Sequence, residues 1–335
     1  MKKNIEIIAE LAQGFEGKPE QTFQLLRAAA ASGANAAKFQ LVYADELATP
    51  DYKHYDLFKD LEMDNQVWEE LIKISKELSI EVIFDIFGVK SLALAEQLGG
   101  NTVMLHATDI TNLELIKEVS KCSMDRVILG AGGAYLSEIE SAINLLANKQ
   151  VYIMLGFQGY PTPDSHNQIS RISHISSWAA ERYDNVVIGF ADHSLPDSNL
   201  LASFSSMAYA AGARIFEKHL TLSQVMKLED YESAINPDKF SDYCYDLKEC
   251  VKAYGLTENT QDFGMSLSEK RYRKFVQRHI IAIKNLKKGS IISKADIKLG
   301  RSSNDTAITE IEKVLGKKLF VDYKKNQAFN ESDLG

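Results

Sequence analysis

Short runs of apolar and β-branched residues alternate with longer amphipathic stretches over the first two thirds of the chain. Eight of these runs have the length of a buried strand: Ile5–Glu10, Ala36–Leu41, Glu81–Ile86, Asn101–Ala107, Arg126–Gly130, Val151–Phe157, Val186–Asp192 and Arg214–Leu220. The amphipathic stretches between them predict helices at Glu20–Ser32, Gln66–Leu78, Leu113–Ser120, Glu138–Ala147 and Leu200–Ala211. This alternation is typical of parallel strands joined by crossover helices.

The number of strand-like runs favours one of two parallel architectures. Eight strand–helix repeats within about 250 residues match the size of a closed (β/α)₈ barrel. An open doubly wound sheet usually has fewer strands, and no Gly-x-Gly-x-x-Gly motif follows the first run. We therefore expect a TIM barrel over residues 1–255.

The sequence changes character after the eighth run. A helical stretch from Asp238 to about Ala253 is followed by a polar segment, and we expect a linker at 256–271. Residues 272–335 contain short apolar runs joined by lysine–glycine turns, which predicts a small β-rich domain. Within that domain, residues 286–292 and 323–329 resemble each other, and each segment is followed by an aspartate. This similarity indicates an internal repeat.

Composition and charge exclude several classes of function. Hydrophobic residues make up 45% of the 335 residues and charged residues 25%, and no apolar stretch approaches the roughly 20 residues of a membrane span. The formal net charge is −8 with no broad basic face, which argues against a nucleic-acid partner. The three cysteines form no Cys-x-x-Cys pair, so no disulfide framework is expected. Since the first residues do not resemble a signal peptide, we expect a cytoplasmic protein.

Catalytic side chains of a TIM barrel come from the carboxyl ends of the strands and from the loops that follow them. This rule selects Glu10, Lys38, Gln40, Asp85, His106, Asp109, Gln158, Tyr160, Asp192, His193, Glu217 and His219. His193 and His219 follow or end neighbouring strands, which lie about 4.8 Å apart, so both imidazoles can reach one point. Two imidazoles near carboxylates suit Mn²⁺, Mg²⁺, Fe²⁺ or Zn²⁺, although each ring could instead only form hydrogen bonds in a crowded loop.

Lys38 and two carboxylates are the other candidates for chemistry. Lys38 lies inside an apolar run, where an ammonium is costly unless an anion meets it. That anion is a phosphate or carboxylate ligand, or Glu10 on the neighbouring strand, or each in turn: Glu10 without ligand and the ligand's anion once it binds. Glu10 and Asp109 are candidates for proton transfer because burial raises the pKa of a carboxyl group, and a structural role is the alternative for each.

Several motifs resemble, in the same order, those of the sialic acid (N-acetylneuraminate) synthases and their legionaminate and pseudaminate relatives. They include a Tyr-Pro-Thr-Pro motif, an Asp-His motif, a Glu-Lys-His motif and a part similar to the family's antifreeze-like (SAF) domain. The segments concerned are Ala9-Glu10, Ala34–Gln40, Gly159–Pro163, Ile188–Ser194, Phe216–Thr221 and Ala282–Ile297. The resemblance covers nearly the whole chain.

The resemblance implies a metal-dependent condensation of phosphoenolpyruvate with the open-chain aldehyde of an N-acetylated amino sugar, which gives a nonulosonic acid. It implies that His193 and His219 bind the metal, Mn²⁺ or Mg²⁺, that Glu10 contacts the reacting centre, and that Lys38 contacts the phosphoenolpyruvate. We expect substrate contacts from Gln40, Asp85, Gln158, Tyr160, Asp192, Glu217, Asp230 and Arg301. The resemblance also implies a domain-swapped homodimer, in which Arg301 of one SAF domain reaches the other chain's barrel.

The chain departs from the family's pattern in the phosphoenolpyruvate pocket. Met104 stands where the family has a lysine, and Ala107, Gly130 and Ala191 stand where it has serines. Asp85 replaces a threonine of the family, and Gln158 replaces an asparagine. Losing several charge-assisted bonds, each worth about 1.5–3 kcal/mol, would weaken binding of a trianion. Three interpretations stay open: the family's synthase reaction, a diverged enzyme with pyruvate or another donor or another carbon–carbon bond reaction, and a sugar-binding protein without activity.

Overall fold

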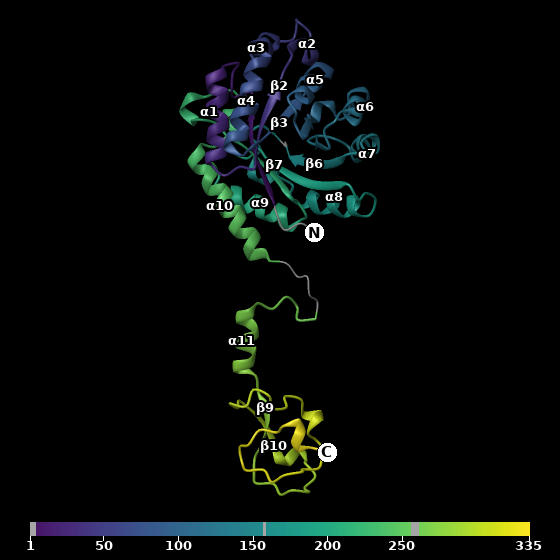
Figure 1. Cartoon of the computed structure of the whole chain (residues 1–335), viewed down its shortest axis with the longest axis vertical. Coiled ribbons are helices and arrows are strands. Elements are labelled where there is room, and N and C mark those ends of the chain that lie inside the picture. Colours follow the sequence, from purple (N-terminus) through teal and green to yellow (C-terminus); the bar gives the residue numbers. More distant parts are fainter. Residues whose placement is uncertain (1–4, 157–158, 256–260) are drawn as a thin grey trace. The chain divides into compact units, whose positions relative to one another are not determined.

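A computed structural model describes residues 5–156, 159–255 and 261–335 of the chain (Figure 1). Contacts between residues divide the protein into two compact units, Met1–Gly255 and Leu256–Gly335. Each unit has an apolar core of its own.

Eight parallel strands of the first unit close into a barrel in chain order. They are β1 (Glu6–Ala12), β2 (Ala36–Leu41), β3 (Glu81–Ile86), β4 (Thr102–Leu105), β5 (Arg126–Gly130), β6 (Gln150–Gly156), β7 (Val186–Asp192) and β8 (Ile215–His219). Because β1 pairs with both β2 and β8, the sheet has no open edge. The predicted TIM barrel is confirmed, and the strand ends differ from the predicted ones by two residues at most. The predicted end of the sixth strand, Phe157, lies outside the described residues.

Helices cover the outside of the barrel (Figure 1). Six of them match predicted stretches: α1 (Pro19–Ala31), α4 (Asn65–Leu78), α6 (Leu113–Lys121), α7 (Leu136–Leu145), α9 (Leu201–Ala210) and α10 (Pro237–Tyr254). Four were not predicted: α2 (Ala44–Leu47), α3 (Tyr55–Asp60), α5 (Val89–Gln97) and α8 (Ser170–Ala180). None of the helices in the described ranges combines the length and apolarity that a membrane span requires.

The start of α5 shows why this helix escaped prediction. Its first backbone amides donate to a side chain far away in sequence, since the N–H groups of Lys90 and Ser91 lie 2.6 and 3.0 Å from the carboxylate oxygens of Glu46. This carboxylate satisfies amides that have no partner within a helix, and its charge also suits a helix N-terminus. The residues around position 88 give no sign of this distant carboxylate, so local sequence does not reveal where the helix begins.

Side chains along each strand point alternately outward and into the barrel, and this alternation builds two apolar layers. One packs between the strands and the helices, and the other fills the barrel interior with Ile8, Ala36, Ile83, Met104, Ile128, Met154, Ala191 and Ile215. Side chains two positions apart point to the same face of a strand. Glu10, Lys38, Asp85 and Glu217 each come two residues after one of these interior positions. The same alternation therefore brings their side chains to the carboxyl end of the barrel interior.

The described part of the second unit contains α11 (Leu267–Val276), β9 (His279–Ala282) and β10 (Ile297–Gly300), and the two strands pair antiparallel. The expected linker at 256–271 did not anticipate α11, which extends across its predicted end. Ser266 begins this helix by accepting a hydrogen bond from the backbone of Glu269 at 3.1 Å. A polar, basic helix with no buried residue lacks the apolar stripe on which helix prediction depends.

The two similar segments of the second unit pair with each other. Leu286 and Tyr323 exchange two backbone hydrogen bonds of 2.9 and 2.8 Å and form an antiparallel bridge. Both side chains are buried in the core of this unit, where the ring of Tyr323 stacks on Phe329. The internal repeat seen in the sequence therefore corresponds to two segments that meet in one core.

Candidate active site

A cavity of about 760 Å³ lies at the carboxyl ends of the barrel strands. It is lined by most of the residues that the sequence selected, namely Glu10, Lys38, Gln40, Asp85, His106, Tyr160, His193, Glu217, His219 and Asp230. The barrel therefore brings together one lysine, four carboxyl groups and two neighbouring imidazoles from segments far apart in sequence.

Lys38 is the ionic centre of this cavity. Its side chain is 2% exposed, its Nζ lies 2.6 Å from Oε2 of Glu217, and it forms a second ion pair with Glu10. The expected pair with Glu10 is present, and Glu217 is a further partner. Strand register explains the arrangement, because Glu10 on β1 is paired with Lys38 on β2 and with His219 on β8. Nζ of Lys38 also lies 2.8 Å from the sulfur of Met104.

Burial and charge act in opposite directions on these groups. Burial disfavours the charged ammonium of Lys38, but attraction by Glu10 and Glu217 outweighs it and raises the pKa of this lysine above its usual value. Burial raises the pKa of Glu10 well above its usual value, although Lys38 opposes the shift. Burial therefore favours the protonated form of Glu10 more than it would for an exposed glutamate.

Asp85 has a different environment from Glu10. It is 1% exposed, and its Oδ1 has no hydrogen-bond partner among the described residues. Burial raises the pKa of Asp85 to about 8, and the charge of Lys38 only partly opposes this effect. The carboxyl group therefore titrates near neutral pH, which suits a group that takes and returns a proton.

His193 and His219 lie side by side in the cavity, with ring centroids 5.0 Å apart and ring planes at 62°. Burial lowers the pKa of His193 to about 4 and that of His219 well below its usual value, so both rings are neutral at pH 7. Nδ1 of His193 lies 3.2 Å from the carbonyl oxygen of Ala191. Donation there places the lone pair on Nε2, an arrangement common for histidines that bind metals.

The two imidazoles fit a divalent ion only in part. Neutral imidazole is the form that binds metals, and the two rings are close enough to share one ion. However, no group of three or more His, Cys, Asp or Glu residues in the described ranges is arranged to hold a metal. A shared ion would therefore take its other ligands from water or substrate, as in catalytic sites with open positions.

A hydrogen-bonded chain forms another part of the wall. The hydroxyl of Tyr160 donates to the carbonyl oxygen of Asp230 at 2.6 Å, and Oδ2 of Asp230 accepts from the backbone N–H of Gln13 at 3.2 Å. The side-chain amide of Gln13 then donates to Gln40 at 2.7 Å. Asp230 adopts a left-handed backbone with φ of 66°, a conformation that aspartate tolerates better than most residues. Its position in a loop gave no reason to select it apart from the family resemblance.

Asp109 does not line the cavity that contains Lys38. β4 ends at Leu105, and Asp109 lies in the 3₁₀ turn that follows (Ala107–Asp109), where its Oδ1 accepts a 2.8 Å hydrogen bond from Asn112. It lines a neighbouring cavity of about 820 Å³. The two cavities share Gln40, Tyr52, His106 and Thr108.

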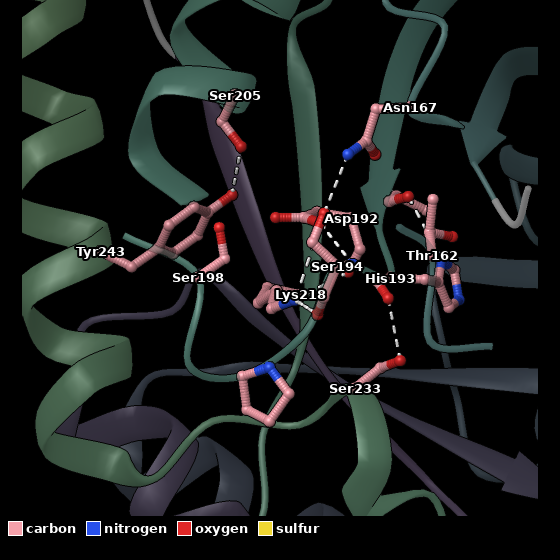
Figure 2. Close-up of polar contacts among 12 residues, drawn as sticks. Thr162, Asn167, Asp192, His193, Ser194, Ser198, Ser205, Lys218, Ser233 and Tyr243 are labelled. Atoms are coloured by element: carbon pink, nitrogen blue, oxygen red, sulfur yellow. Dashed lines mark hydrogen bonds and ion pairs between the residues drawn. The ribbon is translucent and has the colours of Figure 1, made fainter. Parts of the chain in front are cut away.

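Asp192, predicted to contact the substrate, does not line the cavity and lies beside Lys218 and Ser194 instead (Figure 2). Neighbouring residues of a strand point to opposite faces, so Asp192 and Lys218 both face the outer layer. Nζ of Lys218 lies 3.6 Å from Oδ1 of Asp192 and donates to the carbonyl oxygen of Ser194 at 2.8 Å. Oδ1 of Asp192 accepts from the backbone N–H of Ser194 at 2.7 Å.

The same cluster fixes the backbone of His193 from two other loops (Figure 2). The carbonyl oxygen of His193 accepts 2.8 Å and 2.9 Å hydrogen bonds from the backbone of Thr162 and the hydroxyl of Ser233. Asn167 donates to the hydroxyl of Ser194 at 2.9 Å. Residues that do not line the cavity therefore determine where this imidazole lies.

Two aromatic residues of the cavity wall escaped the sequence analysis. Tyr52 and His54 lie between α2 and α3, and their rings are 5.7 Å apart. The strand-end rule omits them because they come eleven and thirteen residues after the end of β2 at Leu41. Gln158 lies outside the described residues. Arg301 is exposed in the second unit, whose placement relative to the cavity is not determined.

Comparison with known proteins agrees with this architecture. The model of the NeuB family matches residues 25–259, and that of the SAF domain matches residues 277–335. The chain is 28% identical to N,N'-diacetyllegionaminic acid synthase of Campylobacter jejuni over 99% of this chain and 100% of that protein. It is 24% identical to a pseudaminic acid synthase of the same species, over 99% and 97% of the two chains. The crystal structure of a spore coat polysaccharide biosynthesis protein E from Chromobacterium violaceum has the same fold, with a TM-score of 0.82 at 20% identity over 99% and 100% of the two chains.

Proposed function

The chain belongs to the NeuB family, and we propose that it is a synthase that joins a three-carbon acid, phosphoenolpyruvate or a relative of it, to the open-chain aldehyde of an N-acetylated amino sugar. The product is a nonulosonic acid, and the enzyme is a transferase that forms a carbon–carbon bond. Relatives over nearly the whole chain carry the names of legionaminic and pseudaminic acid synthases. The observation that carries the proposal is the pair of neutral imidazoles in one cavity with the Lys38–carboxylate cluster.

Lys38 holds the carboxylate of the three-carbon donor. In the protein alone its ammonium is shared by Glu10 and Glu217. Because burial favours the protonated form of Glu10, this residue can release its hold on Lys38 as the donor's carboxylate arrives. Glu10 then contacts the reacting centre as a neutral acid, able to give a proton to the oxygen of the new alcohol.

The sugar lies along the wall formed by Gln40, Tyr160 and Asp230. Their amide, hydroxyl and carboxyl groups suit the hydroxyls and acetamido group of an open-chain amino sugar. The hydrogen bonds through Gln13 hold these three residues in one arrangement before the sugar binds. Such preorganisation lowers the entropic cost of placing the aldehyde next to the donor.

His193 and His219 would hold a divalent ion, Mn²⁺ or Mg²⁺. When bound, the ion supplies Lewis-acid polarisation of the aldehyde oxygen. The protein contributes neutral rings, the 3.2 Å contact of His193 with the carbonyl oxygen of Ala191, and the hydrogen bonds that fix the His193 backbone.

The remaining assignments extend the proposal beyond the cavity. We infer a cytoplasmic homodimer in which Arg301 of the SAF domain, residues 272–335, contacts the sugar in the partner's barrel. The linker at 256–271 would allow this exchange between chains. Gln158 would contact the substrate from the loop after β6, and Asp109 would act on the sugar from the neighbouring cavity.

The test uses the purified full chain with a panel of N-acetylated amino sugars, phosphoenolpyruvate or pyruvate, and either Mn²⁺ or a chelator. Mass spectrometry detects a nonulosonic acid, which we expect only with metal. His193→Ala/His219→Ala should abolish product and metal binding with an unchanged circular dichroism spectrum. The matched control is His166→Ala/His174→Ala, which changes two exposed histidines outside the cavity. Unchanged metal stoichiometry in the first double variant would refute the metal site, and absence of product from both donors with every sugar would refute the synthase.

A further inference from the structure

Three loops at the carboxyl end of the barrel meet at the backbone carbonyl oxygen of His193 (Figure 2). The loop after β6 supplies the backbone N–H of Thr162, which donates to this oxygen at 2.8 Å. The loop after β8 supplies the hydroxyl of Ser233, which donates to the same oxygen at 2.9 Å. The peptide that follows His193 is therefore held from two directions by segments that are far apart in sequence.

Each of the three loops also carries a residue that lines the cavity. Tyr160 comes two residues before Thr162, and Asp230 comes three residues before Ser233. The hydroxyl of Tyr160 donates to the carbonyl oxygen of Asp230 at 2.6 Å, which joins the same two loops a second time. The ring of Tyr160 also packs against both imidazoles, with centroid distances of 6.0 and 5.7 Å. His193 and the wall proposed for the sugar therefore belong to one closed circuit of hydrogen bonds.

The segment that contains Ser233 also contacts the backbone beside the other imidazole. The backbone N–H of Ile235 donates to the carbonyl oxygen of His219 at 3.0 Å, and the carbonyl oxygen of Ile235 accepts from the backbone of Thr221 at 3.1 Å. These bonds form a short parallel bridge between Leu220 and Ile235. The stretch 230–235 therefore holds the backbone of both histidines and fixes their spacing from one another.

Within this stretch, Ser233 is the residue whose side chain reaches His193. It is fully buried, and its hydroxyl would be costly to remove from water without a partner. The carbonyl oxygen of His193 already has a partner in Thr162, and one hydrogen bond is enough to satisfy a buried carbonyl. The second hydrogen bond is therefore not required to satisfy the backbone of His193. Its effect is to restrict the orientation of the peptide and, with it, the direction in which the imidazole projects.

We infer that Ser233 is a positioning residue, whose hydroxyl sets where the His193 imidazole lies relative to His219 and to Tyr160. Ser233 does not line the cavity, so it acts through His193 rather than by touching a ligand. The inference rests on the proposed function, because it assigns a residue to the ion site proposed there. Removing a residue that holds a metal-binding group in place typically weakens metal affinity or activity by about 10–100-fold.

The first experiment observes the imidazole by NMR without any metal. The full chain is labelled with ¹³C at Cε1 of its 7 histidines, and the His193 signal is assigned from its absence in His193→Ala. Ser233→Ala should shift the His193 signal and that of His219, because the two ring centroids are only 5.0 Å apart. Ser205→Ala is the matched control: Ser205 is equally buried, its hydroxyl pairs with that of Tyr243 at 2.8 Å (Figure 2), and its loss should leave both signals in place. An unmoved His193 signal in Ser233→Ala, or equal shifts in the two variants, would overturn the inference.

The second experiment measures the dissociation constant of Mn²⁺ for the full chain by isothermal titration calorimetry. Ser233→Ala should weaken binding by about tenfold, and Ser233→Cys, whose thiol is a weaker donor, should lie between Ser233→Ala and the parent protein. Ser205→Ala should bind Mn²⁺ as the parent protein does, while urea denaturation shows similar losses of stability for the two alanine variants. Unchanged affinity in Ser233→Ala, or equal weakening in Ser205→Ala, would overturn the positioning role. A parent protein that binds no Mn²⁺ contradicts the proposed ion site, whereas a shifted His193 signal still supports the placement of that ring by Ser233.

Discussion

Two buried lysines on the barrel strands have opposite surroundings. Lys38 on β2 faces the cavity, where its ion pairs with Glu10 and Glu217 raise its pKa despite burial. Lys218 on β8 faces the outer layer, where it donates mainly to backbone carbonyls and Asp192 lies 3.6 Å away. Burial lowers the pKa of Lys218, and the attraction of Asp192 does not compensate.

The comparison separates a chemical role from a structural one. Both side chains are almost fully buried, so exposure does not distinguish them. The partners of Lys38 are carboxyl groups that can exchange places with an incoming anion. The partners of Lys218 belong to the loop that carries His193 and cannot leave without moving that imidazole. We therefore expect substitution of Lys38 to affect activity first, and substitution of Lys218 to affect stability first.

The largest effect on stability is expected for Lys218→Met. It removes the only ion-pair partner of Asp192 among the described residues and leaves the backbone carbonyls of Asp192 and Ser194 without this donor. Breaking a buried pair from one side typically costs about 3–5 kcal/mol of unfolding free energy. Urea denaturation measures the loss. Lys18→Met is the control, because Lys18 is 60% exposed in its pair with Glu16 and should cost less than about 1 kcal/mol. Equal losses for the two variants would contradict the structural role.

Lys38→Met should reduce turnover by about 10²–10³-fold, the effect typical of removing one preorganised charge from an active site. Its effect on stability should depend on pH. Without Lys38, the folded-state pKa values of Glu10 and Asp85 rise further above their unfolded values. Stability is therefore fully present below about pH 4 and is lost as pH rises through the raised values. Urea denaturation at pH 4, 6 and 8 checks this, and a loss independent of pH would contradict it.

Asp85→Asn should have the opposite effect on stability, a gain in place of a loss, over a smaller range of pH. The folded pKa of Asp85, about 8, lies above its ordinary value, so this group weakens the folded state as pH rises from about 4 to 8. Asparagine removes that loss, at about 1.4 kcal/mol for each pKa unit crossed. The variant should therefore gain stability relative to the parent protein between pH 5 and 8. Asp184→Asn, which changes an exposed aspartate in the loop before β7, should give a flat difference. A flat difference for Asp85→Asn would mean that its carboxyl group is ionised throughout.

The smallest effect is expected from restoring anion-binding groups. Met104→Lys with Ala107→Ser places a second ammonium near Lys38 and should improve phosphoenolpyruvate affinity by about tenfold, or 1.4 kcal/mol. Isothermal titration calorimetry measures it, with Met104→Leu/Ala107→Ser as the control for altered packing. No gain over that control would mean that this part of the cavity serves a different ligand.

The sequence by itself determined the architecture and the central pair of histidines. Eight runs of strand length with helical stretches between them specify a parallel barrel, because side-chain periodicity follows directly from backbone geometry. His193 and His219 could be brought together on paper because adjacent parallel strands end at the same edge. The same reasoning chose Lys38 and Glu10, which proved to be an ion pair across neighbouring strands.

Only the tertiary structure decided which face each polar residue presents and which distant group meets it. Asp192 was selected with His193, yet it lies on the outer face with Lys218, because the phase of strand alternation is set by packing on both sides. The second partner of Lys38, Glu217, is 179 residues away in sequence. Whether Oδ1 of Asp85 finds a hydrogen-bond partner depends on every segment around it, and none of the described residues supplies one. Local periodicity is a property of the backbone, whereas burial and pairing depend on the summed geometry of all eight strands, and no local stretch of sequence contains that sum.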